Sequence, residues 1–166
     1  MPQMYMKKGE FAFGAALINP MKAMELGLVY EAFKEDYIKL LCCINISFFG
    51  TCRKGTVKGS QKDLNYPSMQ ALIESGKSFT VEFSRTVTNV GPVGSTYKAK
   101  VITNSHINVS AKPSALLSGH LVRRNPFVVT VSGKGLPIKI RVSASIMRSD
   151  GTHNVRSPIV VYTNEA

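Results

Sequence analysis

The sequence predicts a mainly β fold, in which an antiparallel β-sandwich follows a short segment of loops and one helix. Three observations lead to this prediction. From about residue 63 onward, hydrophobic and polar residues alternate with a period of two. Clusters of turn residues separate the alternating runs. Upstream of them, residues 29–42 show the spacing of hydrophobic residues that is typical of a helix.

Residues 29–42 predict an amphipathic helix of about three turns. Phe33, Tyr37, Leu40 and Leu41 fall on one face, and charged residues fill the other side. A loop-rich stretch precedes this helix, and the polar linker GTCRKGTVKGSQK follows it. The chain is therefore expected to change its structural class near the end of this linker.

Six alternating runs after the linker predict strands, and turn signals such as NVGPVGS and SGKGLP lie between them. The runs are residues 79–87, 96–101, 107–111, 127–131, 138–146 and 157–162. In the fifth run the inward positions are predicted to be Ile138, Ile140, Val142, Ala144 and Ile146. Roughly seven short strands over about a hundred residues, separated by turn signals, are typical of an antiparallel sandwich.

The stretch RSDGTHNVRSP contains Ser149, Asp150 and His153, the three residue types of a hydrolytic triad. Asp150-Gly151 is a strong hairpin-turn signal between the last two runs. A triad needs groups that converge from separate segments, together with an oxyanion hole, and one hairpin tip does not supply these. We therefore interpret the stretch as a turn and predict no catalytic residue in it.

The chain is basic, with 21 Lys and Arg against 10 Asp and Glu, which gives a net charge of +11. Much of this charge alternates with apolar residues, as at Lys98 and Lys100, which is typical of the solvated face of a sheet. No nucleic-acid-binding motif accompanies it, and no run reaches the roughly 18 apolar residues of a membrane span. We therefore expect neither a nucleic-acid nor a membrane partner.

No motif for a cofactor or a metal is found. The three histidines are isolated and lack the cysteine or carboxylate spacing of a metal site. No P-loop, HExxH or GxSxG motif occurs. We therefore predict neither cofactor nor metal. The first residues lack the apolar region of a secretory signal, so the chain as written is expected to be cytoplasmic.

Cys42, Cys43 and Cys52 leave two interpretations open. A disulfide between Cys52 and one of the adjacent pair would close a small loop, whereas three reduced thiols would suit a cytosolic protein equally well. Two N-glycosylation sequons begin at Asn45 and Asn108. Asn108 falls on the outward phase of its run, so a glycan there would leave the core undisturbed.

Several blocks of the sequence are similar to the C-terminal portion of plant subtilisin-like serine proteases (subtilases) of the cucumisin type. They are EFAFGAALINPMKAMELGLVYE (10–31), DYIKLLC (36–42), DLNYPSM (63–69), RTVTNVG (85–91) and SDGTHNVRSPIVVY (149–162). The resemblance implies that residues 1–61 form the C-terminal tail of a subtilisin-type α/β peptidase domain plus a linker. It implies that residues 62–166 form a fibronectin type III-like domain, a sandwich that supports the fold and activity of the protease.

The resemblance places the family's catalytic Asp, His and Ser upstream of residue 10, so the chain itself is expected to show no peptidase turnover. Its expected function is that of the non-catalytic C-terminal portion of a secreted serine endopeptidase, with the upstream peptidase domain as partner and the apoplast as location. An alternative is a stand-alone fibronectin-like module that binds or regulates other subtilases. For the disulfide, the resemblance favours Cys42 as the partner of Cys52, because Cys43 stands where the family usually has glycine.

Two positions depart from the family pattern in the predicted core. Ser118 stands where an inward phenylalanine is usual, and Arg148 replaces the tryptophan of the family's WSDG block. Arg148 is in phase with Ala144 and Ile146, so we expect it to point toward the interior or its rim, with a loss of packing and an unpaired charge. Arg85 also has an inward phase, but the family has arginine there, which implies a partnered or snorkelling side chain.

Overall fold

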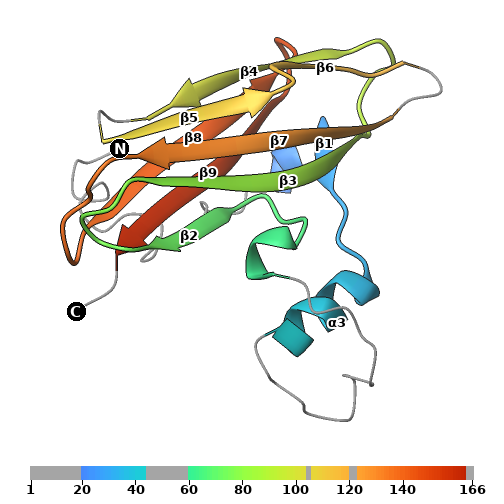
Figure 1. Cartoon of the computed structure of the whole chain (residues 1–166). Coiled ribbons are helices and arrows are strands. Elements are labelled where there is room, and N and C mark those ends of the chain that lie inside the picture. Colours follow the sequence, from blue (N-terminus) through green and yellow to red (C-terminus); the bar gives the residue numbers. More distant parts are fainter. Residues whose placement is uncertain (1–19, 44–59, 104–105, 120–122, 164–166) are drawn as a thin grey trace.

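The computed structural model describes residues 20–43, 60–103, 106–119 and 123–163. In these residues two sheets pack face to face, and helix α3 lies beside the sandwich, below β1 in Figure 1. The helical elements are α2 (Pro20–Ala23), α3 (Lys34–Cys43) and the 3₁₀ helix η3 (Gln61–Asp63). The strands are β1 (Leu28–Tyr30), β2 (Met69–Ile73), β3 (Phe79–Asn89), β4 (Thr96–Ile102), β5 (Ile107–Lys112), β6 (Ala115–Leu117), β7 (Arg124–Gly133), β8 (Arg141–Ser149) and β9 (Asn154–Thr163). The prediction of a mainly β fold is confirmed.

The two sheets differ in their number of strands, and one of them contains a parallel strand pair. One sheet has the order β1-β3-β7-β5, and the other has the order β2-β9-β8-β4-β6. The strand pairs are antiparallel except β2 with β9, which run parallel. Strands β8 and β9 form a hairpin in which Ser149 lies opposite Asn154. The turn predicted at Asp150-Gly151 is thus confirmed.

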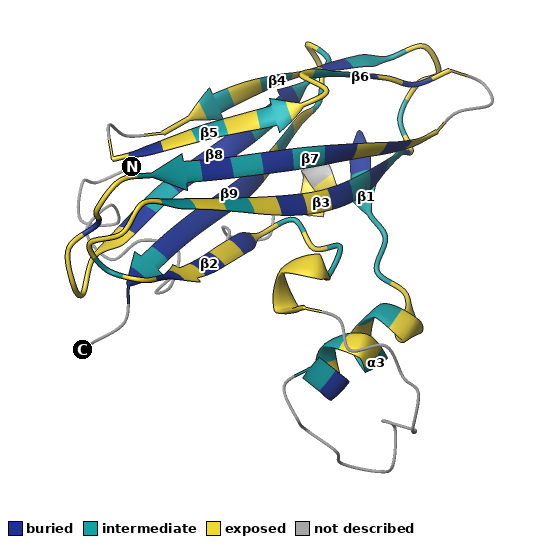
Figure 2. Cartoon of the chain, viewed as in Figure 1, coloured by how far each residue is buried: buried dark blue, intermediate teal, exposed yellow. Residues whose placement is uncertain are grey.

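The core lies between the sheets and takes alternate residues from both (Figure 2). Phe83 and Val87 contribute from β3, and Tyr97, Ile146 and Ile159 contribute from the opposite sheet, all nearly or fully inaccessible to water. Burying an apolar side chain of this size stabilises a fold by roughly 1.5–3 kcal/mol relative to leaving it exposed. The two-residue period of the sequence is therefore the direct cause of the two-layer architecture.

The helix predicted for residues 29–42 is wrong in its first part, because the helix begins only with α3 and its predecessor is the strand β1. β1 pairs with β3, where Leu28 lies opposite Asn89 and is buried. The Asp36 carboxylate accepts a hydrogen bond from the Phe33 N–H at 3.0 Å, which caps the first turn of α3. Pairing with β3 thus outweighs the helical spacing upstream of this cap.

The strand predicted for residues 138–146 also begins later, at the start of β8. Ile138 and Ile140 are exposed, at 49% and 38%, so the prediction that they point inward is wrong. Lys139 has a φ of 60°, a left-handed conformation that interrupts an extended chain. The Ile140 N–H donates to the Thr163 hydroxyl at 3.1 Å, so this loop is held by the end of β9.

Strands β2 and β6 were not predicted from the sequence. In β2, Met69, Ala71 and Ile73 are buried and alternate with exposed residues. Its residues MQALI favour a helix by intrinsic propensity, and only pairing with β9 makes the segment a strand. β6 spans three residues, too few for a periodic pattern to be visible.

Candidate functional site

The hairpin tip between β8 and β9 holds Ser149, Asp150 and His153 in a local network. The Asp150 carboxylate accepts hydrogen bonds from the backbone N–H groups of Thr152, at 2.9 Å, and of His153, at 2.6 Å. Its second oxygen lies 2.9 Å from Nδ1 of His153. The Ser149 hydroxyl instead accepts a hydrogen bond from the Gly151 N–H at 3.1 Å. The three side chains therefore stabilise a turn, as the sequence analysis predicted.

The network makes the hairpin sensitive to acid. Burial would raise the pKa of Asp150, but the hydrogen bonds outweigh this and hold the pKa well below its ordinary value of 3.8. A lowered pKa stabilises the fold at pH values above the pKa of the unfolded state, and this contribution is lost as the pH falls. We expect Asp150→Asn to lower the free energy of unfolding by about 1–2 kcal/mol at neutral pH. The difference from the parent chain should shrink as the pH is lowered below 3.8.

Urea denaturation across this pH range measures the effect of Asp150→Asn. The matched control is Glu74→Gln, since Glu74 is an exposed carboxylate that forms an ion pair with the equally exposed Lys77. A loss of stability at neutral pH that persists unchanged in acid would contradict an electrostatic role for Asp150.

The chain that leads into β1 packs directly on this hairpin. Val90 donates its N–H to the Gly27 carbonyl at 3.0 Å. A Cβ atom at position 27 would lie 2.5 Å from the Tyr97 hydroxyl and 2.7 Å from Cβ of His153, so this close approach requires glycine. Burial raises the pKa of Tyr97 to about 12, and the nearby Asp150 carboxylate acts in the same direction. The N-terminal segment is thus seated on the end of the sandwich.

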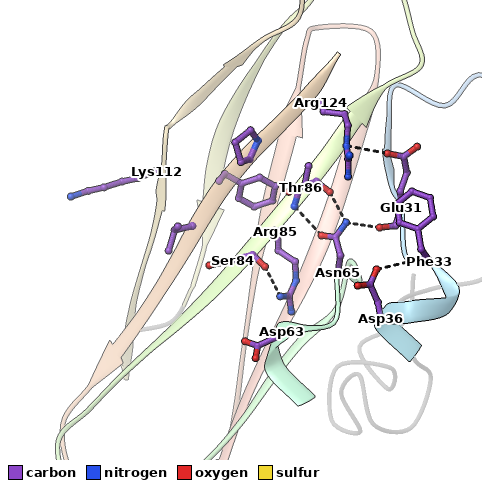
Figure 3. A pocket seen from close by; sticks show the side chains of 13 residues that line it. Glu31, Phe33, Asp36, Asp63, Asn65, Ser84, Arg85, Thr86, Lys112 and Arg124 are labelled. Atoms are coloured by element: carbon purple, nitrogen blue, oxygen red, sulfur yellow. Dashed lines mark hydrogen bonds and ion pairs between the residues drawn. The ribbon is translucent and has the colours of Figure 1, made fainter. Parts of the chain in front are cut away.

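A second contact between the N-terminal segment and the sandwich is made by Asn65 (Figure 3). Its side-chain amide donates hydrogen bonds to the carbonyl oxygens of Glu31 and Thr86, each at 2.8 Å. Its side-chain oxygen accepts a hydrogen bond from the Thr86 N–H at 2.9 Å. One side chain therefore joins the segment after β1, the loop after η3 and strand β3.

We refer to the place where the segment after β1, the loop after η3 and strand β3 meet as the junction. We expect Asn65→Leu to weaken it. The substitution keeps the approximate volume but leaves three backbone groups without their partner, which costs about 1–3 kcal/mol in the free energy of unfolding. The measurements are urea denaturation and limited proteolysis, in which cleavage around α3 should become faster. Gln70→Leu, at an exposed position of β2, is the control. Unchanged proteolysis of Asn65→Leu would show that the junction does not depend on this side chain.

Tyr30 and Glu31 reinforce the junction at the end of β1. The Tyr30 hydroxyl lies 2.6 Å from the Ser157 hydroxyl of β9, and its ring meets the Phe127 ring edge-on at 6.4 Å between centroids. Burial raises the pKa of Tyr30. The Glu31 carboxylate accepts a hydrogen bond from the Thr88 hydroxyl at 2.6 Å. β1 is therefore held by side chains from both sheets.

Arg85 ties η3 and the loop after it to the sandwich. It is buried, and its Nε donates to the Tyr66 carbonyl at 3.0 Å. Its Nη1 donates to the carbonyls of Lys62, at 2.7 Å, and Ser84, at 2.8 Å. Burial lowers the pKa of Arg85. The prediction of a partnered side chain is confirmed.

The junction borders an open hollow of about 460 Å³. Its walls carry both signs of charge, with Asp36 and Asp63 on the N-terminal side and Arg85 and Arg124 on the sandwich side (Figure 3). Within the described ranges, no three His, Cys, Asp or Glu side chains are placed to hold a metal ion. The polar side chains around the hollow mainly make contacts between the N-terminal segment, the loop after η3 and the sandwich. The site therefore holds these three parts of the chain together.

Several large apolar side chains of residues 20–43 are exposed to solvent. We call these residues the N-terminal apolar surface: Met21, Met24, Leu26, Phe33, Tyr37 and Leu41. Met21 and Met24 are the most exposed, at 73% and 75%. In the described residues no helix has the length and hydrophobicity needed to cross a membrane. Large apolar side chains exposed in one segment favour a role as a contact surface.

The remaining predicted sites are only partly within the described residues. Cys42 is buried and disulfide-bonded, and Cys43 is a free thiol. Cys52 and Asn45 lie outside the described residues, so the pairing of Cys42 with Cys52 and the sequon at Asn45 stay predictions. Asn108 is exposed on β5, in agreement with its predicted outward phase.

Ser118 and Arg148 both lie inside, at 3% and 2% exposure, as the family pattern implied for Ser118 and the phase of its run predicted for Arg148. The Arg148 guanidinium packs over the Phe127 ring at 4.3 Å, and its Nη2 donates to the Pro113 carbonyl at 3.3 Å. Its Nε and Nη1 are buried without a hydrogen-bond partner. Burial lowers the pKa of Arg148. The expected unpaired charge is thus present.

The sequence analysis missed the roles of Tyr30 and Asn65, two of the residues that make the junction. Asn65 belongs to DLNYPSM, one of the blocks that carries the resemblance, and this was the available signal. Nothing in a linear pattern indicates that its amide reaches the backbone of both β3 and the segment after β1.

A family model described as a fibronectin type-III domain matches residues 63–161. The chain is 48% identical to subtilisin-like protease SBT4.8 of Arabidopsis thaliana over 92% of its own length and 23% of that protein. It is 47% identical to subtilisin-like protease SBT4.10 of the same plant over 95% of its own length and 24% of that protein. The chain thus spans about a quarter of the length of these relatives. The division into residues 1–61 and 62–166 stays a prediction. Strand β1, which comes before residue 61, is part of the four-stranded sheet.

Proposed function

Because the chain belongs to the fibronectin type-III domain family, we propose that it is a supporting module and carries out no catalysis itself. It is homologous to the C-terminal region of plant subtilisin-like proteases and does not cover their catalytic domain. Its proposed role is that of the non-catalytic C-terminal portion of a secreted plant serine endopeptidase. There it supports the fold and the activity of the peptidase domain.

The N-terminal apolar surface is the observation that carries this proposal. Met24 and Phe33 are too exposed to stabilise the described residues, at 75% and 52%. The segment that bears them is nevertheless fastened to the sandwich through β1 and Asn65. Such a segment suits a connector whose outer side packs on the upstream peptidase domain and whose inner side packs on the sandwich.

The same proposal implies where the chain is located and how it is modified. A secreted protease places it in the apoplast, an oxidising compartment in which a disulfide between Cys42 and Cys52 persists. The secretory route also exposes the sequons at Asn45 and Asn108 to glycosylation.

A chimera tests the proposal. The C-terminal region of the Arabidopsis relative SBT4.8 is replaced by this chain, and secreted peptidase activity is compared with that of the intact relative and of a truncated form. We expect the chimera to regain most of the activity that truncation removes. Met24→Glu with Phe33→Glu should abolish the gain, whereas Lys98→Glu and Lys100→Glu on the outer face of β4 should not.

Two results would count against the proposal. A chimera that is secreted but no more active than the truncated relative would remove the supporting role. A full chain that is monomeric and cooperatively folded by itself, with the N-terminal apolar surface protected from proteolysis, would favour the stand-alone module instead.

A further inference from the structure

Strand β5 is the longest edge strand among the described residues. It lies at the end of the four-stranded sheet and pairs with β7 on one side (Figure 1). The other edge strands are β1 and β6, of three residues each, and β2, of five, while β5 has six. An exposed edge of this kind pairs readily with another strand unless the chain protects it.

The sequence of β5 offers little protection of its own. Its residues are INVSAK, and Lys112, the last of them, is the one charged residue in the strand. Natural edge strands are usually blunted by several charges, by proline or by a bulge. A second copy of this chain would meet a strand with small polar outward residues, which favour close edge-to-edge pairing.

The outward residues of β5 form a glycosylation sequon. Asn108 and Ser110 lie two residues apart on the same face of the strand, and both are exposed. Their neighbours across the sheet are Ser132 and Thr130, so the face around them is polar. We propose that Asn108 carries an N-linked glycan that covers the free edge of β5 and keeps it from pairing with a second copy of the chain. This inference rests on the secretory route of the proposed function.

The modification is a group transfer with defined partners. The side-chain nitrogen of Asn108 forms a bond to the anomeric carbon of an oligosaccharide supplied as a lipid diphosphate. The bond from that carbon to the diphosphate oxygen breaks, the lipid diphosphate leaves, and one amide proton passes to a base of the transferase. The asparagine remains an uncharged amide, so the fold gains bulk at the edge without a buried charge.

The experiment uses the full chain, expressed in plant cells behind a cleavable secretory leader and followed by a tag with one added sequon. Glycans are released with an amidase in ¹⁸O-labelled water, which converts each glycosylated asparagine to labelled aspartate. We expect labelling at position 108, and its loss in Ser110→Ala but not in Ser110→Thr. The non-glycosylated variant Ser110→Ala should shift from monomer to dimer in light scattering, whereas the non-glycosylated variant Asn108→Lys should stay monomeric, because a lysine on an edge strand opposes pairing.

Each part of the inference has its own contrary result. An unlabelled Asn108 in material whose tag is glycosylated overturns the site. A labelled Asn108 combined with a Ser110→Ala variant that stays monomeric overturns the shielding of β5. Because the leader and the tag sequon are supplied, both results are independent of whether the protease chimera is active.

Discussion

Arg148→Met is expected to stabilise the chain, although it removes a hydrogen bond and a ring contact. The guanidinium is 2% exposed, and two of its three nitrogens are buried without partners. The guanidinium makes one hydrogen bond of 3.3 Å, to the Pro113 carbonyl, and lies 4.3 Å from the centroid of the Phe127 ring. Replacing a buried, poorly compensated charge by an apolar side chain of similar length typically raises the free energy of unfolding by about 1–4 kcal/mol.

Urea denaturation at neutral pH measures the effect of Arg148→Met, with Lys100→Met as the control. Lys100 lies on β4 and is exposed, so the same loss of charge there should change stability by less than about 0.5 kcal/mol. Arg148→Trp restores the residue that the resemblance implies and should stabilise as well, since Phe127 already provides an aromatic neighbour. If Arg148→Met is less stable than the parent chain, the expectation is wrong. The bond to Pro113 and the contact with Phe127 would then outweigh the cost of burying the charge.

Periodicity predicted the sandwich because alternate burial is a property of single strands. It placed Ile146, Asn108 and Arg148 on the correct faces, and the Asp150-Gly151 signal located the last hairpin. These features depend on residues that are close in the sequence. They could therefore be inferred without knowledge of the tertiary structure.

The junction could not be inferred in the same way, because it depends on contacts between distant segments. Leu28 becomes part of a strand only when it lies beside Asn89, and the loop at Lys139 is fixed by the end of β9 through Ile140 and Thr163. Asn65 and Arg85 act on backbone groups, whose positions a side-chain pattern does not encode. The sequence thus shows which arginines point inward and leaves open what they meet there.

Arg85→Met is expected to have the opposite effect from Arg148→Met. Arg85 is equally buried, but it donates hydrogen bonds to the carbonyls of Tyr66, Lys62 and Ser84 at 2.7–3.0 Å. Methionine fills most of the volume and leaves these carbonyl groups unsatisfied, at a cost of about 1–3 kcal/mol each when water does not replace the donor. Since the loop after η3 is partly open to solvent, we expect a total loss of about 3 kcal/mol in the free energy of unfolding.

The loss in Arg85→Met should be local at first, because the bonds to Lys62 and Tyr66 hold the chain between η3 and β2 on the sandwich. Hydrogen exchange should become faster in residues 60–68 at denaturant concentrations where β3 and β7 remain protected. Arg85→Lys keeps the charge but offers one nitrogen where the guanidinium uses two, so it should recover only part of the stability. Full recovery by lysine would show that the positive charge, and not the pair of guanidinium N–H donors, holds the chain between η3 and β2 on the sandwich. A uniform loss of protection over β3 and β7 would show that Arg85 supports the core as a whole and not the junction.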